Sequence, residues 1–330
     1  MMFEPFLLKP ASKDYLWGGT RLNDDFGKEI DMSPLAETWE CSTHPEGQST
    51  VATGKFAGML LGDLLKLHPD YLGIHSLLLT EGKPELPILV KLIDAKKDLS
   101  IQVHPDDSYA RVHENSMGKT EMWYVLQAGR NSKLVYGFSR DVTKDEVRTA
   151  IQQNKLPNLL NYVPVHSNDL FFIKAGTVHA IGAGTLVAEI QQNSNVTYRL
   201  YDYGRRDKQG NLRQLHIDKA LDVLKLTSSA VPSQPLRLLR YSKGRASEFL
   251  SRCHYFQVER MLINTESNRR LVAFQTDEES FHALLCVDGC GVLLGDNIQI
   301  NFFKGDCIFV PASSIPLKIH GKAQILNINC

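Results

Sequence analysis

The sequence predicts a mainly β protein built from two related barrels. Strand-like segments dominate the chain, and they are short, rich in β-branched and aromatic residues, and separated by Gly, Pro, Asn or Asp. They form an early and a late series, and one pattern recurs in both. The segment NDLFFIKAG at 168–176 resembles GDCIFVPA at 305–312 in its order of polar and apolar residues. This weak internal similarity indicates two barrels rather than one.

The predicted strands follow from local composition. The early series covers residues 49–53, 86–94, 99–104, 121–126, 132–136 and 169–173. The late series covers residues 281–287, 291–294, 298–302, 306–310 and 323–328.

Helices are expected to be few and short. The clearest begins after Thr143, because Thr143 and Glu146 have the spacing of a capping box in front of the apolar positions of 147–151. Residues 227–235 are rich in Ser and Pro and lack periodicity, which is typical of a linker. We therefore expect a first domain at 1–226, a linker at 227–235 and a second domain at 236–330. Shorter helical patterns occupy 60–67, 106–114 and 217–224.

Charge and composition exclude several functional classes. The chain has 37 Lys and Arg against 37 Asp and Glu, so it has no excess of positive charge for binding along a nucleic-acid backbone. No apolar run reaches the ~18–20 residues of a membrane-spanning helix. Residues 1–10 carry an acid and two prolines, which disfavours a secretion signal, and the six cysteines form no Cys-x-x-Cys pair. We expect a cytoplasmic protein, a monomer or small homo-oligomer, whose partner is a small molecule rather than nucleic acid or a membrane.

Residues 99–105 (LSIQVHP) are the most informative stretch for function. Side chains alternate between the two faces of a strand, so Ser100, Gln102 and His104 share one face. A polar row of this kind fits either a solvated outer face or the wall of a polar pocket.

Two further residues favour the pocket. Glu121 opens the apolar strand 121–126, and His179 follows the turn that ends a Phe-Phe-Ile strand. Each alone is more often a surface carboxylate or a hydrogen-bonded loop imidazole. Together with Gln102 and His104, however, they supply two imidazoles, a carboxylate and an amide oxygen, a set suited to Zn²⁺ or another divalent first-row metal. The spacing His-x16-Glu followed by Gly-x-x-His resembles the metal motif of the cupin superfamily.

Longer blocks narrow this resemblance to one family. Over roughly residues 5–225 the chain is similar to the type I mannose-6-phosphate isomerases. The resemblance implies two cupin-type jelly-roll β-barrels, with a few short helices inserted in the first. It also implies a metal-dependent aldose–ketose isomerase that interconverts mannose 6-phosphate and fructose 6-phosphate through an enediolate proton transfer. The blocks that carry it are LWGG at 16–19, AETW at 36–39, STHP at 42–45, QVHPD at 102–106, GKTEMW at 118–123, AGTVHA at 175–180 and NVTYRLYD at 195–202.

The resemblance also implies a metal site. One Zn²⁺ per chain is expected in the first barrel, on Gln102, His104, Glu121 and His179, with Gln102 the weakest ligand because its amide is neutral. The second barrel lacks the matching His and Glu positions and is expected to hold no metal.

Further residues match family positions that act on the substrate. Arg199 matches the catalytic arginine, and since a guanidinium is not a base at ordinary pH, we expect it to stabilise the enediolate or steer the phosphate. Lys91 and Glu189 both compete for the role of base; burial is expected to lower the pKa of Lys91 and to raise that of Glu189. Ser100 and Lys119 are expected to bind the substrate and its phosphate, Lys119 from the same face as Glu121 if that strand extends back. Second-tier candidates for the pocket wall are Arg205, Trp17 and His44.

Two other functions remain open. Two histidines and a carboxylate also describe a cupin-type non-haem iron oxygenase, although that reaction gives Arg199 and Lys119 no obvious task. The other alternative is a non-catalytic cupin that binds a sugar phosphate. The chain has no basic helix-turn-helix pattern, which argues against a DNA-binding regulator.

Overall fold

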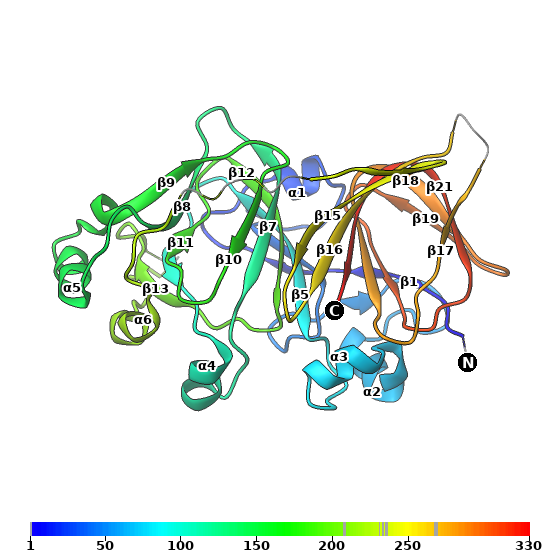
Figure 1. Cartoon of the computed structure of the whole chain (residues 1–330), viewed down its shortest axis with the longest axis horizontal. Helices are drawn as coiled ribbons and strands as arrows, with labels where there is room; N and C mark the ends of the chain where they lie inside the picture. Colours follow the sequence, from blue (N-terminus) through cyan, green and yellow to red (C-terminus); the bar gives the residue numbers. More distant parts are fainter. Residues whose placement is uncertain (1, 207–208, 231, 233, 235–236, 267–269) are drawn as a thin grey trace.

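The computed structural model describes residues 2–206, 209–230, 232, 234, 237–266 and 270–330. Strands dominate these residues, and three antiparallel sheets follow one another along the long axis of the molecule (Figure 1). The prediction of a mainly β fold with a few short helices is confirmed. None of the helices in the described ranges is long and apolar enough to cross a membrane.

Two sheets belong to the first half of the chain. The six-stranded sheet has the order β10 (Leu170–Ile173), β7 (Glu121–Ala128), β12 (Thr185–Gln192), β5 (Ile88–Ala95), β3 (Glu37–Cys41) and β2 (Ala11–Lys13). The five-stranded sheet has the order β13 (Tyr198–Tyr201), β6 (Ile101–Val103), β11 (His179–Ala180), β8 (Lys133–Phe138) and β9 (Leu160–Pro164).

The third sheet contains the late strands and also two early ones. Its main path is β14 (Arg240–Ser242), β15 (Arg245–Arg252), β16 (Gln257–Asn264), β21 (Leu317–Asn329), β18 (His282–Leu294), β20 (Cys307–Val310), β1 (Phe6–Lys9) and β4 (Thr50–Val51). Strand β17 (Val272–Phe274) pairs with β21, and β19 (Gln299–Phe303) pairs with β18. The N-terminal strand β1 therefore hydrogen-bonds to β20 of the second half, with Leu8 opposite Cys307.

The helices lie outside the sheets. Those predicted at 60–67, 106–114, 144–151 and 217–224 are confirmed as α2 (Leu61–Leu67), α4 (Asp107–Glu114), α5 (Lys144–Gln152) and α6 (Ile217–Val223). The capping box of α5 is present, since Glu146 N donates to Thr143 Oγ1 at 3.2 Å and Thr143 N donates to Glu146 Oε2 at 2.8 Å. The remaining helices are α1 (Arg21–Asp24), α3 (Ile74–Leu79) and two 3₁₀ turns, η1 (Pro69–Tyr71) and η2 (Leu156–Leu159).

Every predicted strand segment overlaps a strand, but one predicted break is wrong. Segments 281–287 and 291–294 are parts of the single strand β18. Between Cys286 and Asp288 the register against β21 shifts, and Gly289 has φ +75°. A β-bulge at this point lets the strand continue through a glycine that resembles a turn in the sequence.

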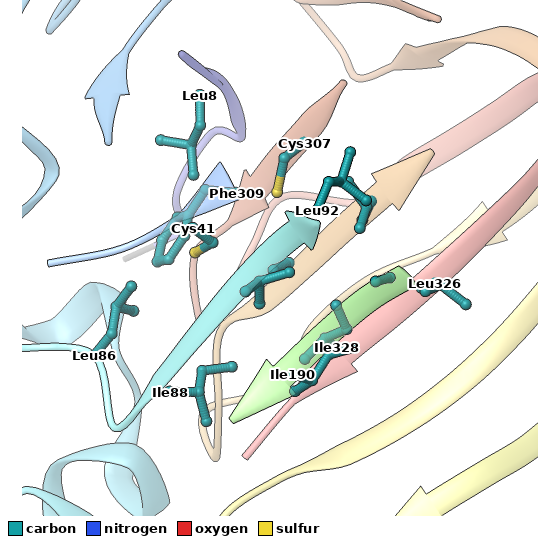
Figure 2. Close-up of a cluster of buried hydrophobic side chains, with 14 of the residues drawn as sticks. Leu8, Cys41, Leu86, Ile88, Leu92, Ile190, Cys307, Phe309, Leu326 and Ile328 are labelled. Carbon is teal, nitrogen blue, oxygen red and sulfur yellow. The ribbon is translucent and has the colours of Figure 1, made fainter. Parts of the chain in front are cut away.

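The hydrophobic core crosses from the first half of the chain to the second. One buried cluster includes Leu92 on β5 and Ile190 on β12 together with Leu326 and Ile328 on β21 (Figure 2). Strand β12 has no alternating pattern because all eight of its residues are buried, and a strand buried on both faces loses the period of two that identifies strands in a sequence. The predicted linker 227–235 contains residues 231, 233 and 235, which lie outside the described residues.

Candidate active site

A cavity of about 250 Å³ opens between the two sheets of the first half of the chain. One wall comes from β5, β7 and β12, and the other from β6, β13 and the segments beside them. Its lining is dominated by charged and polar side chains. The residues that line it are Tyr15, Trp17, Glu37, Lys91, Ile93, Leu99, Ser100, Gln102, Lys119, Trp123, Ile181, Glu189, Asn195, Thr197, Arg199 and Arg213.

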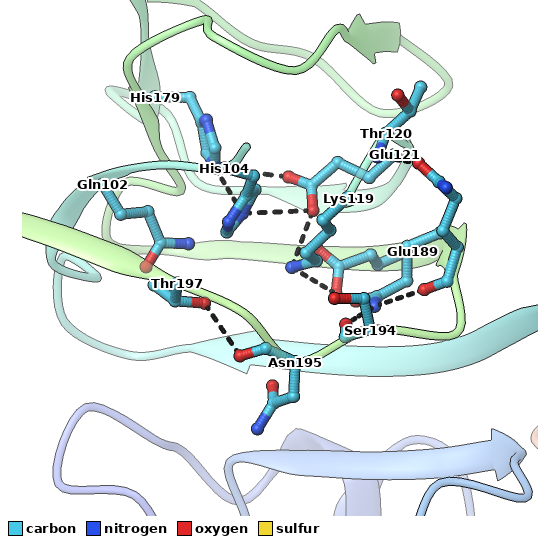
Figure 3. A network of polar contacts seen from close by, with 12 residues as sticks. Gln102, His104, Lys119, Thr120, Glu121, His179, Glu189, Ser194, Asn195 and Thr197 are labelled. Carbon is cyan, nitrogen blue, oxygen red and sulfur yellow. Dashed lines mark hydrogen bonds and ion pairs between the residues drawn. The ribbon is translucent and has the colours of Figure 1, made fainter. Parts of the chain in front are cut away.

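Three predicted metal ligands meet beside this cavity. His104 directly follows β6, Glu121 begins β7 and His179 begins β11, where it lies opposite Gln102. All three side chains are buried, and one ligand atom from each lies within 4.8 Å of the others (Figure 3). Residues distant in the sequence thus converge on one point because three strand ends do.

Hydrogen bonds fix the two imidazole rings in one tautomer. His104 Nδ1 lies 2.9 Å from the carbonyl oxygen of Val196, and His179 Nδ1 lies 2.8 Å from that of Thr177. A carbonyl oxygen only accepts, so each Nδ1 carries the proton and each Nε2 presents a lone pair in the neutral ring. The two Nε2 atoms are 3.1 Å apart. Two lone pairs at this distance repel unless a cation lies between or beside them.

The electrostatics of the rings agree with ligation. Burial lowers the pKa of His179 to about 4, and burial is also the main reason why the pKa of His104 is well below its usual value. Both rings are therefore neutral at ordinary pH, the form that binds a metal.

Glu121 completes the candidate metal group. Its carboxylate oxygens lie 3.3 Å from His179 Nε2 and 3.5 Å from His104 Nε2. Both oxygens are buried, and among the described residues only Lys119 offers a donor, to Oε2. Burial raises the pKa of Glu121 to about 8, although Lys119, whose Nζ is 2.8 Å away, opposes the shift. A buried carboxylate whose free oxygen faces two imidazole lone pairs fits a divalent cation, and the N₂O donor set suits Zn²⁺.

Gln102 lies next to this group on the side of the cavity. Figure 3 shows its side chain beside those of His104 and His179. Ser100 Oγ donates to Gln102 Oε1 at 3.3 Å, so the amide oxygen already has one partner. Whether Gln102 ligates stays a prediction.

A row of alternating charges crosses the other wall. Glu189 on β12 lies opposite Lys91 on β5, and Lys91 lies opposite Trp39 on β3. Lys91 Nζ is 3.5 Å from Glu189 and 3.4 Å from Glu37, and Trp123 Nε1 donates to Glu189 at 3.0 Å. Lys91, Glu189, Glu37 and Trp123 are all buried, and all four line the cavity.

Both pKa predictions for this row are wrong in sign. Burial favours the neutral form of each group, but the neighbouring opposite charges outweigh it. Lys91, between Glu37 and Glu189, has a raised pKa and remains protonated. Lys119 and Lys91 lower the pKa of Glu189 to about 2, so this carboxylate is ionised. The apolar neighbours of Lys91 and Glu189 in the sequence correctly indicated that both are buried. They did not reveal the oppositely charged side chains on the neighbouring strands.

A third group of cationic side chains lies at the opposite wall. Arg199 Nε and Arg213 Nη2 both donate to Ser100 Oγ, at 3.3 and 3.2 Å. Arg213 is also paired with Asp202 at 3.0 Å. Burial, and then the charge of Arg213, lower the pKa of Arg199 to about 10.

Lys119 reaches the cavity from a loop rather than a strand. Strand β7 begins at Glu121, so the expected backward extension of that strand is wrong. The Nζ of Lys119 nevertheless lies between two carboxylates, 2.8 Å from Glu121 and 4.0 Å from Glu189.

Of the second-tier candidates for the pocket wall, one lines the cavity and two do not. Trp17 lines the cavity, whereas Arg205 and His44 are not among the described residues that do. Arg205 is bound to Asp202 and to the carbonyl oxygen of Asp98. Its role in binding substrate stays a prediction.

Several lining residues were not among the sequence candidates, and three of them carry polar groups that bear on the chemistry: Tyr15, Glu37 and Arg213. Glu37 lies within the AETW block, so that block contained a usable signal. Arg213 lies in a polar turn region without a pattern, and only the folded chain brings it to Ser100.

Known proteins resemble this chain along its whole length. The family model for "Phosphomannose isomerase type I, catalytic domain" matches residues 6–128, and that for "Mannose-6-phosphate isomerase, cupin domain" matches residues 245–329. The chain is 35% identical to mannose-6-phosphate isomerase ManA of Bacillus subtilis, with 99% of each chain covered. It is 39% identical to the mannose-6-phosphate isomerase of Streptococcus mutans, over 69% of this chain and 70% of that protein.

A solved structure gives the same result. The crystal structure of the mannose 6-phosphate isomerase from Bacillus subtilis matches with a TM-score of 0.88 at 33% identity, and 99% of each chain is covered. These matches confirm the expected cupin-type fold.

Proposed function

The chain belongs to the type I mannose-6-phosphate isomerase family, and we propose that it interconverts mannose 6-phosphate and fructose 6-phosphate with one Zn²⁺ bound in the first barrel. The observation that carries this proposal is the convergence of His104, Glu121 and His179 beside a cavity lined with cationic side chains. A sugar phosphate needs both features: a centre for its oxygens and positive charge for its phosphate.

His104, Glu121 and His179 would hold the ion, with Gln102 as the fourth ligand. When bound, Zn²⁺ supplies a Lewis acid that polarises the sugar oxygens. The preference for Zn²⁺ follows from the donor set and from a reaction that needs no redox change.

The isomerisation moves a proton from C2 to C1 of the open-chain sugar and a second proton from the C2 hydroxyl to the oxygen on C1. Glu189 is ionised and faces the cavity, so its carboxylate can accept the carbon-bound proton and return it. Lys91 stays protonated, and we assign it to electrostatic stabilisation rather than to the role of base. Arg199 places a second positive charge on the opposite wall, where it stabilises negative charge that develops on the sugar oxygens.

The phosphate is assigned to polar and cationic groups outside the metal group. Ser100 and Lys119 line the cavity, and Trp17 contributes an apolar wall. Arg205, a second-tier candidate for the pocket wall, is kept as a proposed substrate-binding residue, although its guanidinium is held by Asp202 in this structure.

The oxygenase alternative finds no support in the cavity. An apolar substrate would have to face Lys91, Lys119, Glu37 and Glu189, which are charged and buried.

We further propose that the chain is organised into a catalytic domain, a linker and a second barrel. Residues 1–226 form the metal-binding catalytic domain, 227–235 a linker and 236–330 a second barrel without metal ligands. The positions of the two family matches support this order along the chain, and β1 and β4 of the first part complete the third sheet. We place the protein in the cytoplasm as a monomer or small homo-oligomer, with a sugar phosphate as its partner rather than nucleic acid or a membrane.

A coupled assay of mannose 6-phosphate conversion tests the function. We expect turnover with the Zn²⁺-loaded protein, loss of turnover after chelation and recovery on adding Zn²⁺. Full turnover in thoroughly metal-free protein would refute the metal's role. Tight binding of fructose 6-phosphate without exchange of its C1 hydrogen with solvent would instead support the non-catalytic alternative.

A further inference from the structure

The second barrel is hydrogen-bonded to α4, the helix that precedes the loop carrying Lys119. The turn between β15 and β16 holds Tyr255, and its hydroxyl donates to Asp107 Oδ2 at 2.7 Å. Asp107 is the first residue of α4 in the first half of the chain, so this bond joins the two halves. The ring of Phe256 next to Tyr255 lies against Phe172 of β10, with 6.3 Å between ring centroids, which seats the turn on the first half.

The other oxygen of Asp107 holds the loop itself. Asp107 Oδ1 accepts from Gly118 N at 2.8 Å and from Gln192 Nε2 at 2.9 Å. Gln192 Oε1 in turn accepts from Thr120 N at 2.8 Å. The side-chain nitrogen of Gln192 can only donate and its oxygen can only accept. The Gln192 amide therefore satisfies both bonds in one orientation only.

These bonds bracket Lys119. The main-chain amides of the residues before and after it, Gly118 and Thr120, are both fixed by side chains of this group. The amide of Lys119 donates to the carbonyl oxygen of Pro105 at 3.0 Å. Glycine is required at 118, because a Cβ there would lie 2.4 Å from the main chain of Asp106. The position of the Lys119 backbone is therefore set by its neighbours and not by its own side chain.

The side chain of Lys119 then reaches the centre of the candidate active site. Its Nζ is 2.8 Å from Glu121 and 4.0 Å from Glu189, and the residue lines the cavity. A chain of contacts thus runs from the second barrel through Asp107 to a cation in the active site.

We propose that Tyr255 of the second barrel is a positioning residue for the isomerase reaction, acting through Asp107 on the loop that carries Lys119. This inference rests on the proposed function, in which Lys119 contacts the substrate. It gives the second barrel a task in catalysis beyond covering apolar surface. Loss of the Tyr255 hydroxyl leaves Asp107 Oδ2 without this donor and loosens the loop, so Lys119 samples unproductive positions.

The test is a double-mutant cycle in the full-length, Zn²⁺-loaded protein. Tyr255→Phe removes only the hydroxyl, and Tyr241→Phe is the matched control, since Tyr241 is an exposed tyrosine on β14 of the second barrel. We expect Tyr255→Phe to lower kcat/KM about tenfold, which is less than the ~10²-fold that a 1 Å misplacement of an active-site group can cost, because the other bonds to the loop remain. In a Lys119→Gln background the same change should cost less than about twofold, because residues that act through one another are not additive.

A purely structural role for Tyr255 gives a different result. If Tyr255→Phe lowers kcat/KM by the same factor with and without Lys119, or does not lower it at all, the proposal is overturned.

Amide hydrogen exchange gives a readout that needs no turnover. Amide exchange at Gly118 and Thr120 should accelerate in Tyr255→Phe and stay unchanged in Tyr241→Phe. Unchanged exchange in both variants would show that Tyr255 does not hold the loop that carries Lys119. If the wild-type chain proves unable to isomerise mannose 6-phosphate, the proposed function fails, and the exchange data still decide whether Tyr255 fixes the loop.

Discussion

The Nε2 atoms of His104 and His179 lie 3.1 Å apart, and the Nδ1 of each ring is hydrogen-bonded to a main-chain carbonyl oxygen. This pairing leaves two lone pairs directed at one region, next to the buried carboxylate of Glu121, whose Oε1 has no hydrogen-bond donor among the described residues. Without a cation, the two Nε2 lone pairs would repel each other and the buried carboxylate of Glu121 would remain desolvated, so the arrangement would destabilise the protein. The pairing is therefore better explained by ligation than by packing.

Replacing Arg199 should separate catalysis from metal binding. Among the described residues, the Arg199 side chain donates hydrogen bonds to Ser100 and to the carbonyl oxygen of Gln214, and to none of the three metal-ligand candidates. We expect Arg199→Ala to retain its metal and its fold while kcat falls by about 10²–10³, the scale for losing one preorganised electrostatic group. Elemental analysis and steady-state kinetics measure both. Arg148→Ala, which removes an exposed arginine of α5, is the control; metal loss in Arg199→Ala would mean that its role is misplaced.

Replacing Lys91 should destabilise the fold. Lys91→Met leaves the buried carboxylates of Glu37 and Glu189 without the cation between them. Breaking a buried ion pair from one side costs about 3–5 kcal/mol in the free energy of unfolding. Lys66→Met removes an exposed pair with Asp63 and should cost no more than about 1 kcal/mol. Denaturant unfolding of both variants compares them, and equal costs would show that the Lys91 row is not an ionised network.

His282 should make stability depend on pH. Burial lowers its pKa in the folded protein, and its Nδ1 is 2.7 Å from Asn327 Oδ1. Below the unfolded pKa of about 6.5, the unfolded chain binds a proton that the folded chain does not, so stability falls as pH falls toward the lower folded-state pKa. The loss is at most about 1.4 kcal/mol per pH unit for this one group.

The His282 effect is measured as a difference between variants. In His282→Gln the free energy of unfolding should fall less steeply between pH 7 and 5 than in the wild type, whereas the exposed residue His254 serves as a control in His254→Gln. Parallel pH profiles for wild type and His282→Gln would contradict the prediction.

The second barrel should not fold well on its own. Strand β1 pairs with β20, and one core cluster contains Leu92 and Ile190 together with Leu326 and Ile328. A fragment of residues 237–330 would expose both the edge of β20 and this apolar surface. We expect it to aggregate or to lack a cooperative thermal transition by circular dichroism. A soluble fragment that unfolds at the temperature of the full chain would show that the shared core contributes little.

Local patterns in the sequence identified most of the strands and helices. The capping box of α5 and the polar row on β6 depend on neighbours in the chain, and both were predictable from spacing. The continuity of β18 depends on a bulge at a glycine, which composition alone reads as a turn. Strand β1 joins the distant sheet, a pairing that no local pattern reveals.

In the candidate site, too, local patterns were predictable and contacts between distant segments were not. The candidate metal ligands His104, Glu121 and His179 were found because their residue types and spacing match a family motif. The pKa directions of Lys91 and Glu189 were predicted wrongly, because each is set by an opposite charge on a neighbouring strand. Arg213 carries no sequence signal, since only tertiary structure places it beside Ser100.

The most direct test of the metal site is the zinc content of the purified protein, measured side by side for wild type and His179→Ala after chelation and reloading. We predict about one ion per wild-type chain, as expected for a single site of this donor set, and almost none in the variant. A wild-type chain that takes up no zinc, or a variant that retains a full equivalent, would contradict the convergence of these side chains on one cation.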